Sequence, residues 1–132
     1  MRLGILVSRI RVEEKMIVQA VEQRGLDYTL IDVRDTTFDL LNGEAWQQYD
    51  VVLERCLSQS LALAMTHMLG AQGVACINPA AVIEICGDKL KTSLALAAAG
   101  VPTPETRVAF SAESALGAIE QLGYPVVLKP VV

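Results

Sequence analysis

The chain has 132 residues, of which 52% are hydrophobic and 20% are charged, and its formal net charge is −4 at pH 7. This composition supports a packed core of about one domain and excludes intrinsic disorder. The acidic balance argues against a nucleic-acid-binding surface, which needs an excess of lysine and arginine. No apolar run approaches the roughly 20 residues of a membrane span, and the N-terminal apolar stretch is too short for a signal peptide, so we expect a cytoplasmic protein.

Residues 1–78 alternate short apolar strands with helices. The predicted strands are residues 2–8, 27–33, 50–54 and 74–77. The first helix should end at Gly25 and the second should be capped by Ser58. The residues predicted to face the core are Met16, Ile17, Ala20 and Val21 in the first helix and Leu61, Met65, Met68 and Leu69 in the second. This alternation indicates an α/β fold with a parallel, doubly wound sheet.

The pattern changes after residue 78. Asn78 and Pro79 suit the start of a short helix, and Asp88 can cap a second helix that ends at Gly100. A proline-rich linker, a strand (106–110), a helix capped by Ser111 and closed by Gly123, and a strand (125–129) then follow. We expect a domain at residues 1–78, a helical connector at 79–101 and part of a second domain at 102–132. Because no polar tail follows the apolar C-terminal residues, we expect the chain to be a fragment of a longer protein.

Several common catalytic and binding motifs are missing. The loop after the first strand, residues 7–13 (VSRIRVE), has no glycine, which argues against a dinucleotide-binding fingerprint, and no Walker-type phosphate loop occurs. The single histidine, His67, lies within a predicted helix, where a packed or surface role is the common one. The three cysteines, Cys56, Cys76 and Cys86, lack zinc or disulfide spacing, and we expect small buried thiols. No catalytic residue is identified.

Two lysines occupy positions that folding does not explain. Lys89 lies in the first turn of its helix, where a cation opposes the helix dipole. Lys129 ends an apolar predicted strand, where a charge needs a counter-charge. A polyphosphate bound between the two lysines would satisfy both. The alternative is that Lys89 pairs at the surface with Asp88 or Glu84 and that Lys129 extends into solvent.

Three segments in order carry a family resemblance. They are residues 78–90 (NPAAVIEICGDKL), 94–104 (LALAAAGVPTP) and 123–130 (GYPVVLKP), and together they resemble the entry to an ATP-grasp carboxylate–amine ligase. Residues 53–60 (LERCLSQS) and 82–89 (VIEICGDK) are similar to the LysX ligases in particular. The resemblance covers the whole chain.

The resemblance implies an N-terminal pre-ATP-grasp domain at residues 1–78, followed by the start of an ATP-grasp domain. It implies that Lys89 and Lys129 contact the phosphates of ATP, and that Mg²⁺ is held by residues beyond 132, with no metal ligand in this chain. The implied reaction joins α-aminoadipate, through an acyl phosphate, to the C-terminal glutamate of LysW, a small acidic amino-group carrier protein of lysine biosynthesis. Because the family's glycine-rich loop and metal ligands are missing, we expect the chain alone to be inactive.

Other polar residues follow the first and third strands. The candidate substrate-binding residues are Arg9, Arg55, Ser58, Gln59 and Ser60. They are candidates because ligands of parallel sheets bind beyond the carboxyl ends of the strands, and a helix start attracts anions. The alternatives are that Ser58 only caps its helix and that the two arginines form structural ion pairs.

Two other functions and the oligomeric state stay open. One function is a ligase that adds glutamate, either in arginine synthesis or to a ribosomal protein. The other is a non-catalytic, flavodoxin-like binding module. The sequence does not decide whether the protein forms homo-oligomers or which amino acid is ligated. A glycine-rich loop and a late acidic-x-Asn pattern downstream would distinguish a ligase from a binding module.

Overall fold

The structure, a computed structural model, describes residues 1–131 and divides the chain into two compact units. Unit 1 comprises Met1–Glu84, and unit 2 begins at Ile85. The division falls within helix α3 (Ala80–Gly87). The three-part division predicted at residues 1–78, 79–101 and 102–132 stays a prediction.

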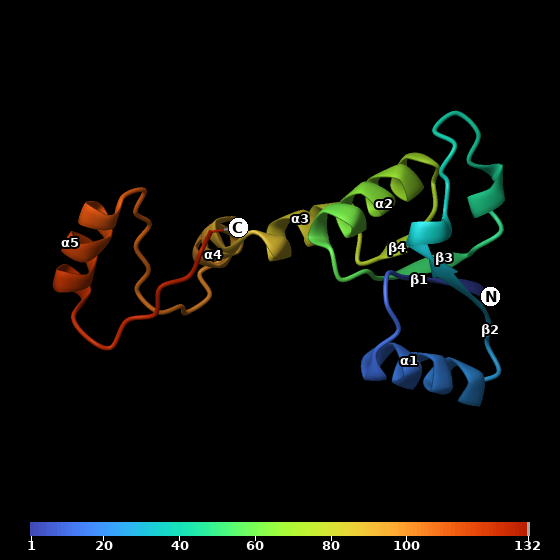
Figure 1. Cartoon of the computed structure of the whole chain (residues 1–132), viewed down its shortest axis with the longest axis horizontal. Helices are drawn as coiled ribbons and strands as arrows, with labels where there is room; N and C mark the ends of the chain where they lie inside the picture. Colours follow the sequence, from blue (N-terminus) through green and yellow to red (C-terminus); the bar gives the residue numbers. More distant parts are fainter. Residues whose placement is uncertain (132) are drawn as a thin grey trace. The chain divides into compact units, whose positions relative to one another are not determined.

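Unit 1 is built on four parallel strands (Figure 1). Strand β1 (Arg2–Val7) pairs with β2 (Asp27–Asp32) on one edge and with β3 (Val51–Arg55) on the other, and β4 (Cys76–Ile77) extends the sheet beyond β3. The strand order β2-β1-β3-β4, with parallel pairing throughout, confirms the predicted α/β class.

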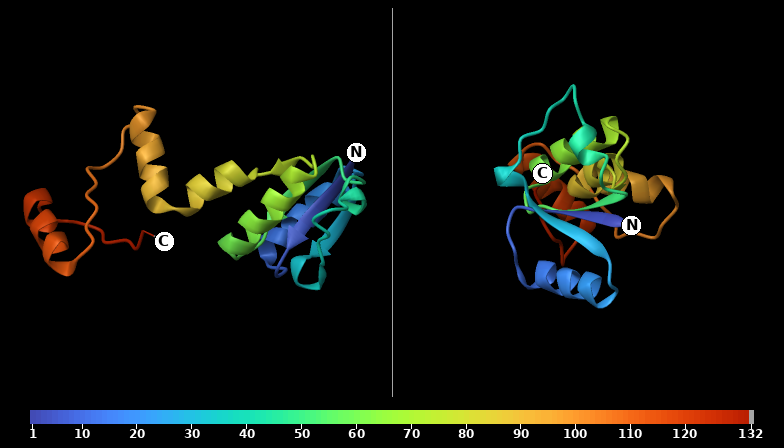
Figure 2. Two further views of the ribbon diagram at one scale, coloured as in Figure 1. Left: turned by 90° about the horizontal axis from the view of Figure 1, so that it is seen from above. Right: turned by 90° about the vertical axis from the view of Figure 1, so that its right-hand side faces the viewer.

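Helices α1 (Val12–Gln23) and α2 (Gln59–Ala71) cover opposite faces of this sheet (Figures 1 and 2). The buried core on the α1 side consists of Leu3, Ile5, Val7 and Val21. The buried core on the α2 side consists of Leu6, Val33, Trp46, Val52, Met65, Leu69 and Val74. Successive residues of β1 therefore serve the two faces in turn, as the pleat of a strand requires.

Both helices bury most of the predicted face but not all of it. Val21, Met65 and Leu69 are buried, and Ile17 and Met68 pack against the two cores as predicted. In α1 the buried residues are Glu14 and Val21, whereas Met16 is 64% exposed. The buried residues of α2 are Ala62, Met65, Thr66 and Leu69. The predicted Leu61 is 42% exposed. The prediction counted only apolar residues, but Glu14 is buried through ion pairs, and the Thr66 hydroxyl is satisfied by the carbonyl oxygen of Ala62 at 2.8 Å.

The helix ends follow the predicted signals. Gly25 lies just beyond α1 with a φ of 62°, a conformation that glycine adopts without strain. The side chain of Ser58 accepts the N–H of Leu61 at the start of α2. In unit 2, Asp88 caps α4 (Lys89–Ala98) and Ser111 caps α5 (Ala112–Leu122). These four signals are confirmed.

The connection between β2 and β3 adds an aromatic cluster to the core. It contains two short 3₁₀ helices, η1 (Val33–Asp35) and η2 (Glu44–Trp46). The Trp46 ring stacks on the ring of Phe38 with 5.5 Å between centroids, and Tyr49 packs beside it. Trp46 is only 8% exposed, so this long connection is fixed to the α2 side of the sheet.

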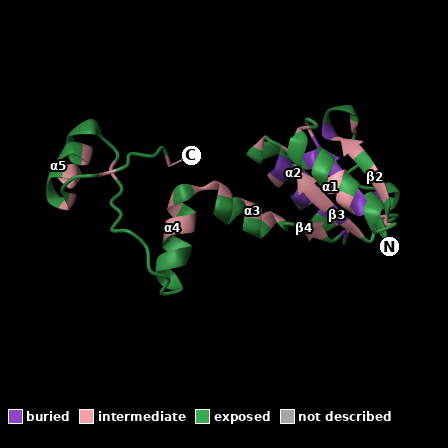
Figure 3. Ribbon diagram, turned by 90° about the horizontal axis from the view of Figure 1, so that it is seen from below, coloured by how far each residue is buried: buried purple, intermediate pink, exposed green. Residues whose placement is uncertain are grey.

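Unit 2 contains helices but no strand within residues 85–131. The strands predicted at 106–110 and 125–129 are therefore wrong for this structure. A strand needs a hydrogen-bonded neighbour, and neither segment has one in the described part of unit 2. Helices α4 and α5 are largely exposed (Figure 3), and neither has a buried residue. One backbone bond joins distant segments of the unit, because the N–H of Lys89 donates to the carbonyl oxygen of Val131 at 3.1 Å.

Leu69 provides a test of the core beneath α2. Its side chain is fully buried, so Leu69→Ala should leave a cavity and lower the free energy of unfolding of unit 1 by about 2–5 kcal/mol. Urea unfolding followed by the fluorescence of Trp46 measures this loss, because Trp46 lies in the same cluster. Leu41 is 98% exposed, so the matched control Leu41→Ala should change stability by no more than about 0.5 kcal/mol. Equal losses in the two variants would contradict the assigned core.

Candidate functional site

The carboxyl ends of β1 and β3 form the edge where a ligand site is expected. The chain leaves β1 towards β2 on one side, whereas β3 lies on the other side of β1, so the strand order reverses there. In open parallel sheets, ligands bind outside the strand ends at such a reversal. The loops that follow the two strands are linked, because the Oγ of Ser8 accepts the N–H of Leu57 at 3.0 Å.

A buried carboxylate, that of Glu14, ties α1 to the end of β3. Its side chain is fully buried. Arg11, just before α1, donates to it from Nε at 2.9 Å and from Nη2 at 2.7 Å. Arg55, the last residue of β3, donates to its Oε1 from Nε at 3.2 Å and from Nη2 at 2.8 Å. Strand alternation explains the meeting, because Leu53 packs on the α1 side and Arg55 has the same parity.

The two guanidinium groups keep Glu14 ionised. They lower its pKa to about 2 from an ordinary value of 4.5, chiefly through the hydrogen bond from Arg11, while burial acts in the opposite direction. The same hydrogen bond raises the pKa of Arg11. A buried charge is tolerated only when it is paired and hydrogen-bonded, and Glu14 meets both conditions.

The predicted substrate-binding residues after β3 make structural contacts. The Oγ of Ser58 caps α2 and lies 2.9 Å from the Oγ of Ser60. The side-chain amide of Gln59 donates to the carbonyl oxygen of Ile83 at 3.1 Å. Arg9 is exposed, and its side chain has no hydrogen bond or ion pair within residues 1–131. Their roles towards a substrate stay predictions.

Lys89 is the first residue of α4, and its side chain is exposed. The alternative that it pairs with Asp88 is wrong for this structure, because that carboxylate accepts the N–H groups of Leu90 and Lys91 at 2.8 and 3.0 Å. No other residue of the described range forms an ion pair or hydrogen bond with the Lys89 side chain. The cation at this helix start therefore lacks an internal counter-charge.

Lys129 is exposed, and the segment before it is not a buried strand. Leu128 is 72% exposed, so the argument that an apolar strand leaves this charge in need of a partner does not apply here. The segment that contains Lys129 is nevertheless bonded to the start of α4. The Lys89 N–H bonds to the carbonyl oxygen of Val131, two residues after Lys129.

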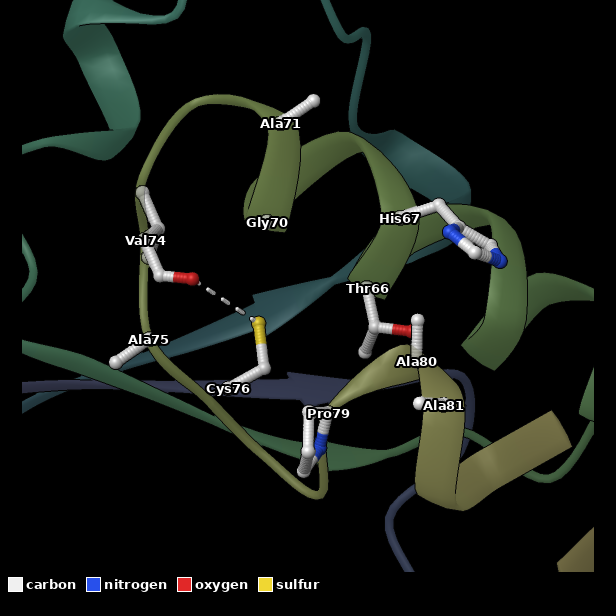
Figure 4. Close-up of a pocket in the computed structure, with 10 residues that line it drawn as sticks. All are labelled: Thr66, His67, Gly70, Ala71, Val74, Ala75, Cys76, Pro79, Ala80 and Ala81. Atoms are coloured by element: carbon white, nitrogen blue, oxygen red, sulfur yellow. Dashed lines mark hydrogen bonds between the residues drawn. The ribbon is translucent and has the colours of Figure 1, made fainter. Parts of the chain in front are cut away.

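An open pocket of about 720 Å³ lies between α2, β4 and the start of α3 (Figure 4). Half of its lining residues are glycine or alanine, namely Gly70, Ala71, Ala75, Ala80 and Ala81. His67 and Cys76 are the lining residues with reactive side chains. The Cys76 thiol donates to the carbonyl oxygen of Val74 at 3.6 Å, and burial raises its pKa. A neutral thiol is a weak nucleophile, so this pocket does not have the features of a catalytic site.

The three cysteines are free, and only two are sheltered. Cys56 and Cys76 are half-buried, whereas Cys86 is exposed, so the prediction of three buried thiols is wrong for Cys86. Cys86 lies on α3, a helix with no buried residue. Burial, with a hydrogen bond to Glu54, raises the pKa of Cys56 to about 12. His67 is exposed on α2, as expected for a surface histidine.

Residues 1–131 contain no group of three or more His, Cys, Asp or Glu side chains that could hold a metal ion. The magnesium ligands implied by the family resemblance were expected beyond residue 132 and lie outside the described residues. In the same range, none of the helices is both long enough and apolar enough to cross a bilayer.

Sequence reasoning missed Glu14 and Arg11. A signal for Glu14 was present, because it precedes Val21 by seven residues and therefore lies on the same helix face. Arg11 stands three residues earlier, within reach for an ion pair across the helix start. The contribution of Arg55 comes from a distant strand and carries no local signal.

Glu14 should make the stability of unit 1 sensitive to acid. Folding lowers its pKa to about 2, so its ionised, paired form stabilises the folded state above the ordinary pKa of 4.5, and this contribution is lost as pH falls towards 2. Glu14→Gln should lower the free energy of unfolding at neutral pH and flatten its decline in acid. The measurement is urea unfolding, followed by Trp46 fluorescence, at neutral pH and at about pH 3.

The difference between parent and variant isolates Glu14 from Asp32, whose pKa is also about 2. A variant that loses stability in acid as steeply as the parent would contradict the role assigned to Glu14.

The comparisons with known proteins agree on one family. Residues 3–85 match the family model described as the LysX preATP-grasp domain. The chain is 39% identical over 130 residues to a glutamate–LysW ligase ArgX of Sulfurisphaera tokodaii, a match covering 98% of this chain and 45% of that protein. It is 34% identical over 135 residues to an alpha-aminoadipate–LysW ligase LysX of the same organism, covering 99% of this chain and 47% of that protein.

A solved ATP-grasp structure resembles this chain over nearly its whole length. The crystal structure of a RimK domain protein ATP-grasp from Sphaerobacter thermophilus superposes with a TM-score of 0.80 at 29% identity, covering 99% of this chain and 49% of that one. The chain thus spans about half the length of the relatives it matches. The matched residues 3–85 include all of the parallel sheet except Arg2, and the whole Glu14 cluster of unit 1. The chain belongs to the LysX preATP-grasp domain family.

Proposed function

We propose that the chain is part of an ATP-dependent carboxylate–amine ligase that joins an acidic amino acid to the C-terminal glutamate of a LysW-like carrier protein in the cytoplasm. The similarity to two kinds of LysW ligase, each over nearly the whole chain, supports this proposal. The structural observation that carries it is the backbone bond between Lys89 and Val131, which joins the segments of the two unpaired lysines of unit 2.

Lys89 and Lys129 are the proposed contacts to the phosphates of ATP. Both side chains are exposed, and neither has a partner within residues 1–131. Lysine suits this role as a compact cation on a flexible stem. Phosphoryl transfer depends on neutralising charge more than on covalent help from the protein. Magnesium would supply further neutralisation of the phosphate charge, and its ligands are proposed among residues beyond 132.

The proposed reaction has two steps. The carboxylate of the carrier's C-terminal glutamate attacks the γ-phosphorus of ATP, forms an acyl phosphate and releases ADP. The amino group of the amino acid then attacks the acyl carbon, forms the amide bond and releases phosphate and a proton. The lysines of this chain would stabilise the negative charge that moves between the phosphate oxygens in the first step.

Two amino acids fit this proposal. The resemblance of residues 53–60 to the LysX ligases favours α-aminoadipate, and hence lysine biosynthesis. The identities of 39% and 37% to two ArgX proteins, against 34% to a LysX protein, favour glutamate, and hence arginine biosynthesis. Both acids carry an amino group for the new bond and a side-chain carboxylate for recognition.

Two other functions make different predictions. A ligase that modifies a ribosomal protein would bind ATP but would not use the carrier. A non-catalytic binding module would not bind ATP at all. ATP binding and carrier ligation therefore separate the three functions.

Removing either lysine should weaken ATP binding. A charge-assisted contact to phosphate contributes on the order of 1.5–3 kcal/mol, so Lys89→Ala and Lys129→Ala should each lower ATP affinity roughly ten- to a hundredfold or more. Lys129→Ala should also nearly abolish turnover, while stability changes little because the side chain is not packed. Calorimetric titration of the full-length protein with ATP measures the affinity.

Lys15 provides the matched control, because it is an exposed lysine on α1 in unit 1. Lys15→Ala should bind ATP like the parent. Parent-like ATP affinity in both Lys89→Ala and Lys129→Ala would contradict the assignment of this chain to an ATP-grasp enzyme.

The amino acid can be identified by ligation. With LysW and ATP, the full-length protein should add one residue of α-aminoadipate or of glutamate to the carrier, detected as a mass increase. The ratio of kcat/KM for the two acids decides between lysine and arginine biosynthesis. A carrier without its C-terminal glutamate is the control and should give no product. ATP binding without ligation of either acid to the intact carrier would argue against a LysW ligase.

A further inference from the structure

The arginines around Glu14 have more donors than the carboxylate uses. Each guanidinium gives its Nε and Nη2 to Glu14, which leaves the Nη1 group of Arg11 and of Arg55 without a partner in the described range. The Glu14 side chain is sealed from solvent, whereas the side chains of Arg11 and Arg55 are 35% and 32% exposed. A ligand that arrives from solvent therefore meets guanidinium groups and not the carboxylate.

The charges of the Glu14 cluster favour a singly charged anion. Arg11 and Arg55 carry two positive charges, and the carboxylate between them carries one negative charge. Glu13 lies 3.8 Å from the Nε of Arg11, but its side chain is 60% exposed, so water weakens that pair. The remaining surplus of one positive charge matches one carboxylate better than a polyphosphate.

The surrounding contacts hold the two arginines in place. The bond from the Leu57 N–H to Ser8 ties together the loops after β1 and β3, where the sheet order reverses. Glu54 belongs to the opposite face of β3, and its carboxylate accepts the N–H of Cys56, so it does not compete for Arg55. An arginine fork fixed in this way is suited to a carboxylate, whose two oxygens match its paired N–H groups.

We propose that Arg11 and Arg55 form a carboxylate-binding site at the carboxyl ends of β1 and β3, and that Glu14 is the positioning residue that orients both guanidinium groups. The inference rests on the proposed function, in which two sources supply a carboxylate. One is the acidic amino acid, since the relatives are named for glutamate and α-aminoadipate. The other is the C-terminal glutamate of the carrier.

The positioning role of Glu14 has a distinctive sign. Glu14→Gln removes a negative charge and so raises the positive charge of the edge. If the site worked through net charge alone, this variant would bind a carboxylate more tightly. If Glu14 positions the arginines, the variant loses the charge that holds the four hydrogen bonds from the two guanidinium groups, so the arginines are less well oriented and the carboxylate binds more weakly. The direction of the change therefore separates the two explanations.

The test is calorimetric titration of the full-length protein without ATP. One arm uses the free amino acids L-glutamate and L-α-aminoadipate, and the other uses a short acidic peptide that ends in glutamate. Arg55→Lys and Glu14→Gln should each weaken binding in one arm about tenfold, because lysine keeps the charge but not the fork. Weakening confined to the peptide identifies the carrier as the source of the carboxylate, and weakening confined to the amino acids identifies the amino acid.

Steady-state kinetics provide a second readout that a structural role would not produce. Arg55→Lys should raise the KM of the affected substrate about tenfold and leave the KM of ATP unchanged. Arg34→Lys is the matched control, because Arg34 forms the same kind of arginine–carboxylate pair with Asp32 at the end of β2. It should leave both arms of the titration unchanged.

Two results would overturn the proposal. Parent-like binding of all three probes by Arg11→Lys and Arg55→Lys would contradict the proposed carboxylate-binding site. These two variants keep the test valid even if Glu14→Gln does not fold. Parent-like or tighter binding of the carboxylate by Glu14→Gln would contradict the positioning role of Glu14. Because the titration needs neither ATP nor turnover, a failure of the ligase proposal in the Lys89 and Lys129 variants would be distinguishable from either result.

Discussion

The burial of β1 on both faces is the constraint on which unit 1 depends. β1 pairs with a strand on each edge, and every residue of it after Arg2 is buried, so it has no room for polar side chains along its length. Even its glycine is required by packing, because a Cβ on Gly4 would lie 3.1 Å from Val52 and 3.3 Å from Tyr49. Polar chemistry can therefore begin only where β1 ends. The loop of Ser8 and Arg9 and the start of α1 are the first positions that can carry it.

The Glu14 cluster contributes little net stability for the number of charges that it buries. Taking three ionised groups partly out of water carries a desolvation penalty that often equals or exceeds the attraction between them, and an apolar replacement of similar volume is frequently as stable. Val21 is also buried on α1, seven residues after Glu14, so this face of the helix accepts an apolar residue. Stability alone therefore does not explain why Glu14, Arg11 and Arg55 meet at the end of the sheet. A role in orienting donors towards a ligand does.

Local signals predicted most of unit 1 and named Arg55 as a candidate, but they missed its partners Glu14 and Arg11. The parallel sheet and the caps at Ser58, Asp88 and Ser111 follow from short-range patterns of apolar, turn and capping residues. The burial of Glu14 depends on Arg55, 41 residues away, and such a contact leaves no periodic trace in either segment. The two strands predicted in unit 2 are wrong for a different reason. Their local β pattern is real, but a strand also needs a neighbouring strand, and local sequence does not supply one.

The two cation types in the chain suit different anions. Lysine is a flexible point charge, so Lys89 and Lys129 can follow phosphate oxygens whose charge moves during phosphoryl transfer, and a loosely held segment is no obstacle to that. Arginine is a planar fork whose value lies in fixed geometry, and Arg11 and Arg55 are held by a buried carboxylate within the rigid unit 1. A ligase that distinguishes one acidic substrate from another needs the second kind of contact, because net charge attracts every anion equally whereas two fixed forks accept a carboxylate in only one orientation. The selective contacts are therefore best built where a buried carboxylate fixes the arginines, at the carboxyl ends of β1 and β3.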